Sequence, residues 1–167
     1  HKQVIRPLTL FYREYGDPQP SRIPILLLHG LFGSSTNWHG IAKRLSQHRQ
    51  VITVDLRNHG RSPRSTSMSY EEMVADLTVL LDELGIERTI PVGHSMGGKV
   101  AMWLALTQPD RVEALAVADM APVTYPGRFR AIIGALSGLD LLGITSRREA
   151  DARLAAELPE AGVRNYL

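Results

Sequence analysis

The pentapeptide at residues 93–97 has the residue types for nucleophilic chemistry. It reads Gly-His-Ser-Met-Gly and places Ser95 in the pattern Gly-x-Ser-x-Gly. A serine hydroxyl is a weak nucleophile unless it is held exposed beside a base. A sharp turn between a strand and a helix gives that exposure, and glycine is needed on both sides because the chain comes close to itself there. The alternative is a plain β-turn-α connection with a helix-capping serine. The apolar run before the motif and the helical pattern after it favour the nucleophile.

A second segment could supply the groups that stabilise negative charge in an acyl-transfer site. Acyl transfer places negative charge on an oxygen atom, which two backbone N–H groups can stabilise. We expect one N–H from Met96, at a helix N-terminus, and the other from the loop His29–Gly33, with Leu31 as the first choice. His29 could instead be a general base, but we favour a histidine that braces its loop through backbone hydrogen bonds. The same interpretation applies to His94.

A charged loop follows the apolar run at residues 51–54. Asp55, Arg57 and Ser62 could form a charged site, but structural roles are commoner for charge pairs so close in sequence. We predict that these three residues bond one another and the backbone, and so hold the loop near the pocket.

The elements that must position these residues alternate between strands and helices. Short apolar or alternating runs predict strands at residues 8–15, 25–28, 51–54, 89–92 and 112–118, and helical patterns predict helices at 38–47, 69–84 and 98–107. Ser69 and Glu72 form a capping-box signal at the start of the second helix. The last four of these strands are expected to be buried. This alternation predicts a parallel sheet covered by helices on both faces.

The pattern changes after Pro122. Helices are predicted at residues 129–142 and 147–158, and no further buried strand follows. We therefore place a boundary between an α/β core, residues 1–122, and a helical region, residues 123–167.

Composition narrows the classes of function. The 167 residues carry a net charge of only +2, and no basic cluster with interleaved aromatic residues suggests nucleic-acid binding. The absence of cysteine excludes disulfides and thiolate metal sites. No apolar run is long enough for a membrane span, and the first residues do not resemble a secretory signal, so we expect a cytoplasmic protein.

Taken together, these segments resemble the α/β-hydrolase superfamily, and within it the small bacterial esterases called YbfF-like. The resemblance rests on His29-Gly30-Leu31-Phe32-Gly33-Ser34, Asn37-Trp38, Asp55-Leu56-Arg57-Asn58-His59-Gly60, Gly93-His94-Ser95-Met96-Gly97-Gly98 and Asp119-Met120-Ala121-Pro122. It implies an α/β-hydrolase core with a mostly parallel sheet, followed by the start of a helical cap, with the C-terminal strands of the fold absent.

The resemblance also implies a function. It predicts a serine hydrolase that cleaves short acyl esters or thioesters through an acyl-enzyme intermediate, with no cofactor and no metal. Ser95 is then the nucleophile, and the N–H groups of Leu31 and Met96 form the oxyanion hole. The partner is a small-molecule ester, neither nucleic acid nor membrane. Two alternatives stay open: a lyase or C–C hydrolase on the same fold, and a non-catalytic protein that keeps the pocket.

The resemblance also implies a Ser-His-Asp catalytic triad, but the sequence offers only the serine and a candidate acid. Asp119, at the end of the strand predicted at residues 112–118, matches the acid of some branches of the superfamily; alternatively, it only caps the turn into Ala121-Pro122. The base should follow the acid in this fold. Every histidine, at positions 1, 29, 39, 48, 59 and 94, precedes Ser95. We therefore expect a catalytic histidine beyond residue 167.

The same reasoning predicts that these 167 residues are a piece of a longer protein and are inactive, or nearly so, alone. The strand at residues 112–118 would otherwise stand as an apolar edge with unpaired N–H and C=O groups. We expect a missing C-terminal part or a second chain to cover it.

Overall fold

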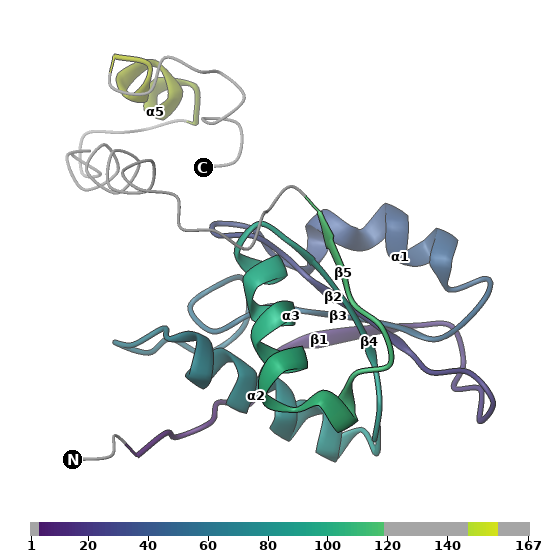
Figure 1. The fold of residues 1–167 in the computed structure, drawn as a ribbon. Coiled ribbons are helices and arrows are strands. Elements are labelled where there is room, and N and C mark those ends of the chain that lie inside the picture. Colours follow the sequence, from purple (N-terminus) through teal and green to yellow (C-terminus); the bar gives the residue numbers. More distant parts are fainter. Residues whose placement is uncertain (1–3, 119–146, 157–167) are drawn as a thin grey trace. The chain divides into compact units, whose positions relative to one another are not determined.

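The computed structural model describes residues 4–118 and 147–156, which fall in two units, residues 1–121 and 122–167 (Figure 1). The first unit contains β1 (Tyr12–Tyr15), β2 (Ile25–Leu28), the 3-10 helix η1 (Ser35–Trp38), α1 (His39–Leu45), β3 (Val51–Val54), α2 (Tyr70–Glu83), β4 (Ile90–His94), α3 (Met96–Thr107), the 3-10 helix η2 (Pro109–Arg111) and β5 (Ala116–Ala118). In the second unit the described element is α5 (Arg147–Leu154). The helix expected at residues 129–142 lies outside the described residues, and the assignment of residues 123–167 to a cap stays a prediction.

The five strands form one sheet in the order β1-β3-β2-β4-β5. β1 runs antiparallel to β3, and every other neighbouring pair is parallel. β2 therefore lies at the centre, and the loops after β2, β3 and β4 all leave the same edge of the sheet. The predicted α/β fold with a mostly parallel sheet is confirmed.

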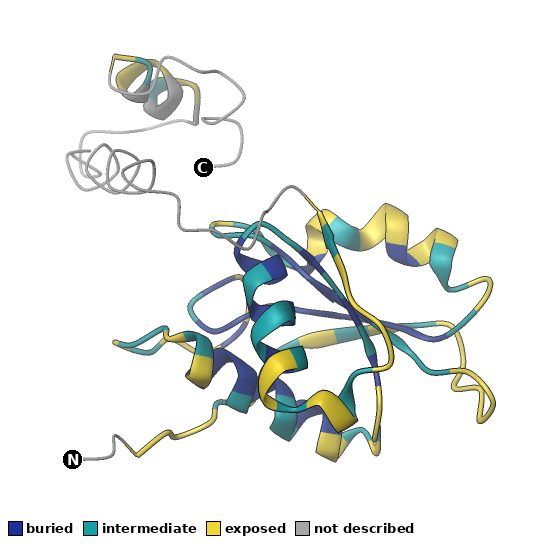
Figure 2. Ribbon diagram, in the orientation of Figure 1, coloured by how far each residue is buried: buried dark blue, intermediate teal, exposed yellow. Residues whose placement is uncertain are grey.

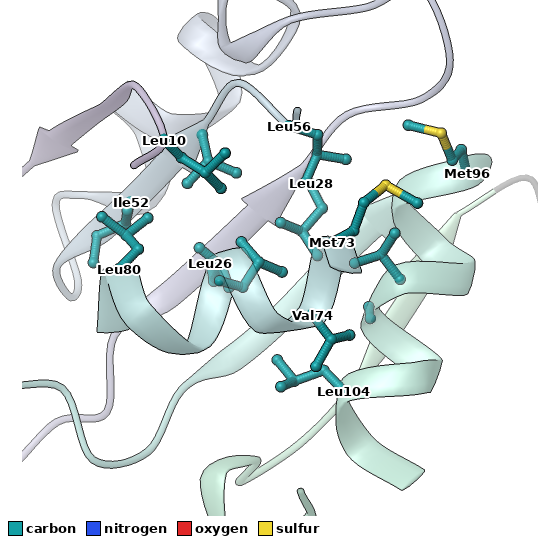
Figure 3. Close-up of a cluster of buried hydrophobic side chains, with 14 residues drawn as sticks. Leu10, Leu26, Leu28, Ile52, Leu56, Met73, Val74, Leu80, Met96 and Leu104 are labelled. Carbon is teal, nitrogen blue, oxygen red and sulfur yellow. The ribbon is translucent and has the colours of Figure 1, made fainter. Parts of the chain in front are cut away.

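Helices cover the two faces of this sheet (Figure 1). On one face, α2 and α3 pack their apolar side chains against alternate residues of β2 and β3, as Figure 3 shows for Leu26, Leu28 and Ile52 of the strands with Met73, Leu80 and Leu104 of the helices. On the other face, Leu27 and Val51 pack against Ala42 of α1. This is the arrangement that continuous apolar strands require.

Helix α2 begins where the sequence predicts. The Ser69 hydroxyl accepts the N–H of Glu72 at 3.2 Å, and the Glu72 carboxylate accepts the N–H of Ser69 at 2.9 Å. Helix α3 begins at Met96 rather than at the predicted residue 98, so it starts directly after Ser95. Ser95 therefore occupies the boundary position between β4 and α3.

Two predicted strands are shorter than expected. At the N-terminus only Tyr12–Tyr15 pairs, because the N–H of Leu8 donates to Asp76 and the N–H of Phe11 donates to Ser62 instead of to a strand.

The second of these is β5, of which only Ala116–Ala118 pairs. The prediction that this strand is buried is wrong: Ala116 and Ala118 are exposed, whereas all four residues of β3 are buried (Figure 2). The reason is position, since β5 has β4 on one side and forms the edge of the described sheet.

Candidate active site

Ser95 sits at a strained turn. Its φ of 54° and ψ of −119° lie where side-chain-bearing residues are rarely found, and such a conformation costs about 1–3 kcal/mol. Its hydroxyl makes no capping hydrogen bond to α3. The alternative of an ordinary helix-capping serine is therefore wrong, and the predicted strained turn between strand and helix is confirmed. The catalytic role of Ser95 stays a prediction.

The glycines of the motif are required by close backbone contacts. A Cβ atom on Gly93 would lie 2.2 Å from the carbonyl oxygen of Gly97, and one on Gly97 would lie 2.3 Å from the carbonyl oxygen of Leu28. No side chain can occupy either position without moving the backbone. The turn is thus held by the close approach of β2, β4 and the start of α3.

The loop after β2 packs directly on this turn. Leu28 is the register partner of Gly93, which brings the following residues beside Ser95. A Cβ atom on Gly30 would lie 3.1 Å from the Cβ of Ser95. A side chain at residue 30 would crowd Ser95, so glycine suits a loop that lies this close to the candidate nucleophile.

The backbone N–H groups near Ser95 differ in what they bind. The N–H of Phe32 donates to Nε2 of His59 at 3.1 Å, and the N–H of Gly33 donates to the carbonyl oxygen of Gly30 at 3.0 Å. By contrast, the N–H groups of Leu31 and Met96 have no acceptor among the described residues. The N–H groups of Leu31 and Met96 are therefore among those that remain for a substrate oxygen, and their part in catalysis stays a prediction.

His29 is a structural residue, as the favoured interpretation holds. Its Nδ1 donates to the carbonyl oxygen of Gly30 at 2.7 Å, and its Nε2 accepts the N–H of Leu56 at 3.0 Å. Burial is the main cause that lowers the pKa of His29 to about 4, against the opposing effect of the hydrogen bond to Gly30. The ring is therefore neutral at pH 7, and both nitrogens are engaged.

His59 has the same arrangement, which the residue pattern did not predict. Its Nδ1 lies 2.9 Å from the carbonyl oxygen of Arg57, and its Nε2 accepts the N–H of Phe32. Its ring centroid lies 5.0 Å from that of His29, at an interplanar angle of 54°. The sequence shows only a histidine in the loop after β3. Its role could not be predicted from that loop, because Phe32 lies in the loop after β2.

Asp55 anchors the same region. Its carboxylate accepts the N–H of Ser35 at 2.6 Å and the N–H of Arg61 at 2.8 Å, and its carbonyl oxygen accepts the hydroxyl of Ser62. Burial alone would raise the pKa of Asp55, but the hydrogen bonds from Arg61 and Ser35 outweigh it and hold the pKa below its ordinary value. Asp55 is thus an ionised loop anchor, and the structural role predicted for Asp55 and Ser62 is confirmed.

Arg57 donates to a backbone carbonyl of its loop, that of Ser67 at 3.3 Å, but the prediction that it also binds Asp55 or Ser62 is wrong. Arg57 binds Asp76 of α2 through Nε at 2.7 Å and Nη2 at 2.9 Å, and its Nη1 lies 3.1 Å from Glu72. The Arg57 and Asp76 side chains are 1% and 0% exposed, so the pair is fully buried. The planar guanidinium can bind both oxygens of one carboxylate in parallel, and Asp76 of α2 provides that acceptor. This ion pair ties the loop after β3 to the helix that covers the sheet.

Asp119 lies outside the described residues, so its role as the acid stays a prediction. What is described is the residue before it. Ala118 ends β5 opposite His94, and its carbonyl oxygen accepts the N–H of Ser95 at 3.2 Å. The described part of the chain also contains no group of three or more potential metal ligands, and none of its helices is long and apolar enough to cross a membrane.

Comparison with known proteins agrees with this geometry. Residues 23–133 match the model of a family described as the alpha/beta hydrolase fold. The chain is 46% identical to the mouse sn-1-specific diacylglycerol lipase ABHD11 over 98% of its own length and 55% of that protein. It is 39% identical to esterase YbfF of Escherichia coli strain K12, over 89% of the chain and 59% of that esterase.

A solved structure described as a marine microorganism esterase superposes with a TM-score of 0.87 at 40% identity, covering 96% of this chain and 62% of that one. The chain spans about half the length of the curated relatives that it matches, at 55% and 53% for two of them. The resemblance to YbfF-like esterases that the sequence indicates is confirmed.

Proposed function

Because the chain belongs to the α/β-hydrolase family, we propose that it provides the nucleophile and the oxyanion-stabilising groups of a serine hydrolase that cleaves carboxylic esters. The observation that carries this proposal is the strained Ser95, whose hydroxyl caps nothing, directly against a loop with an unused N–H group. Strain at one residue persists only where the surrounding structure enforces it, and such residues concentrate at functional sites.

The proposed reaction is acyl transfer in two steps. The Ser95 oxygen attacks the acyl carbon and passes its proton to a histidine. The tetrahedral oxyanion accepts hydrogen bonds from the N–H groups of Leu31 and Met96. The C–O bond to the alcohol then breaks, and the alcohol leaves with that proton. Water repeats the sequence on the acyl-enzyme and releases the acid.

The proposal takes the histidine from sequence beyond residue 167. Among the described histidines, His29 and His59 engage both ring nitrogens in hydrogen bonds, and His39 binds the hydroxyl of Tyr15 at 2.9 Å.

Asp119 is proposed to orient the catalytic imidazole, because Ala118 before it lies against Ser95. The base then follows the acid, in the chain order usual for this fold.

The proposed substrates are small esters with short acyl groups, and the same chemistry would extend to thioesters. The names of the relatives support the bond type: one is an esterase and another is a lipase that acts on diacylglycerol. Carboxylic ester cleavage is the reaction common to both.

The test uses the full-length natural protein and short p-nitrophenyl esters. We expect hydrolysis, and we expect Ser95→Ala to lower kcat/KM by about 10³-fold or more, because removal of one triad member leaves only binding and the oxyanion hole. Ser21→Ala is the matched control, since Ser21 is exposed in the loop between β1 and β2. Activity retained in a folded Ser95→Ala protein would refute the proposal.

The origin of the base has its own test. The 167-residue chain, produced alone and shown to be folded by circular dichroism, should turn over the ester about 10³-fold or more slowly than the natural protein. Comparable turnover would mean that the base lies among residues 1–167, with His29, His59 or His94 as the candidates.

A further inference from the structure

Phe32 lies in a conformation that needs an explanation. It follows Leu31, the proposed oxyanion donor, and has a φ of 65°. This left-handed region costs a bulky residue roughly 1–2 kcal/mol. The Phe32 side chain is 39% exposed, so packing of its ring alone does not account for the strain. Some other contact must hold the backbone there.

That contact is the hydrogen bond from the N–H of Phe32 to Nε2 of His59, at 3.1 Å. For Nε2 to accept, the proton must be on Nδ1, and the carbonyl oxygen of Arg57 lies 2.9 Å from Nδ1 to receive it. His59 is 7% exposed, so solvent does not compete strongly for either nitrogen. Its tautomer and its orientation are both fixed.

The two imidazoles hold the peptide of Leu31 from both sides. His29 donates to the carbonyl oxygen of Gly30, and this oxygen belongs to the same planar peptide unit as the N–H of Leu31. His59 holds the next amide, that of Phe32. Because both neighbours are fixed, the direction of the Leu31 N–H is fixed as well.

We infer that His59 is a positioning residue for ester hydrolysis: by holding the N–H of Phe32, it aims the N–H of Leu31 at the oxyanion. This inference rests on the function proposed above. His59 does not touch the reacting atoms. It acts through the backbone of residues 31 and 32, and it also keeps the Phe32 amide from competing for the substrate oxygen.

Two substitutions in the full-length natural protein separate this role from simple stability. His59→Asn places an amide near the position of Nδ1, so it can keep the bond to the Arg57 carbonyl but cannot reach Phe32. His59→Gln can reach the position of Nε2 and accept the Phe32 N–H. His48→Asn is the control, because His48 is exposed.

We expect His59→Asn to lower kcat and kcat/KM about 10- to 100-fold with KM within about 3-fold, since a displaced oxyanion donor acts only in the transition state. Binding of a trifluoromethyl ketone, which forms a tetrahedral adduct with the serine, should weaken in parallel. His59→Gln should stay within about 5-fold of the parent, and His48→Asn should match it.

Unchanged kcat/KM in His59→Asn, or an equal loss in His59→Gln, would overturn the inference. A loss of activity without weaker ketone binding would overturn it too, because it would indicate general damage. The Ser95→Ala protein tells the two proposals apart. If Ser95→Ala is inactive and His59→Asn is fully active, only the positioning role fails. If Ser95→Ala is active, both proposals fail.

Discussion

The turn at Ser95 and the loop after β2 meet at one point, but they are held in different ways. The turn is held by backbone packed against its glycines: a Cβ atom on Gly93 would clash with Gly97, and one on Gly97 would clash with Leu28 of β2. The loop is held by side chains of another loop. His59 binds it from 27 residues away, and Asp55 binds Ser35, just beyond it, from 20 residues away.

This difference explains why one region could be recognised from a short motif and the other only in part. When a turn requires glycine at particular positions, those glycines in the sequence predict the turn. When side chains of another loop hold a loop in place, the residues of the held loop do not indicate which partners they bind.

The backbone packing at the turn should be less tolerant of change than the side-chain contacts of the loop. Gly97→Ala would place a Cβ atom 2.3 Å from the carbonyl oxygen of Leu28 and 2.5 Å from that of His29. Backbone on both sides must move, so we expect the free energy of unfolding in urea to fall by about 5 kcal/mol, at the extreme of single substitutions. Gly40→Ala in α1 is the control, because nothing lies within 4 Å of its Cβ position. It should be neutral or stabilising by up to about 1 kcal/mol. Similar losses in both variants would contradict this account of the turn.

Among the side-chain contacts between separate segments, those between buried charges should contribute most to stability. Asp76→Asn leaves Arg57 buried without its main counter-charge, and breaking such a pair costs about 3–5 kcal/mol. The control is the exposed pair of Arg88 and Glu113, at 2.7 Å with side chains 50% and 42% exposed. Glu113→Gln should cost less than about 1 kcal/mol. Urea unfolding of the two variants measures the difference, and equal costs would show that burial does not govern the pair.

The Arg57–Asp76 pair also marks the limit of prediction from sequence. The mostly parallel sheet, the capping box at Ser69 and the turn at Ser95 follow from local patterns of apolar, capping and glycine residues. Arg57 was expected to bind within its own loop, but its acceptor is 19 residues away on α2. Asp76 lies in a helical pattern among apolar residues, and spacing alone does not distinguish a buried carboxylate from an exposed one. The role of His59 was missed for the same reason.

Protonation of His29 is a milder way to disturb the side-chain contacts that hold the loop after β2. Burial lowers the pKa of His29 from 6.5 to about 4, so the unfolded chain binds a proton at this residue more readily than the folded one. Folding stability is then fully present above pH 6.5 and falls as the pH drops from 6.5 to 4, by about 3 kcal/mol in total for this group. Urea unfolding at a series of pH values measures it. His29→Gln should remove this part of the slope, and His48→Gln should leave it unchanged. A parent protein with constant stability over this range would show that the ring does not stay neutral because of burial.

The smallest loss of stability should come from changing the helix cap at Ser69, which the sequence predicts clearly. Helix α2 is held by a local contact, between Ser69 and Glu72, and by a distant one, between Asp76 and Arg57. Ser69→Ala removes the acceptor of the Glu72 N–H, and loss of such a cap costs about 1 kcal/mol. The Glu72 carboxylate keeps the Ser67 hydroxyl, the Ser69 N–H and Arg57, which together lower its pKa to about 2.

Ser69→Thr keeps the hydroxyl and should cost less than about 0.5 kcal/mol. In urea unfolding, Ser69→Ala should therefore lie between Ser69→Thr and Asp76→Asn. The local cap marks where α2 begins, while the buried charge stabilises it against the loop after β3. If Ser69→Ala costs as much as Asp76→Asn, the most visible contact in the sequence is also among the most stabilising, and the contrast between local and distant support fails on this helix.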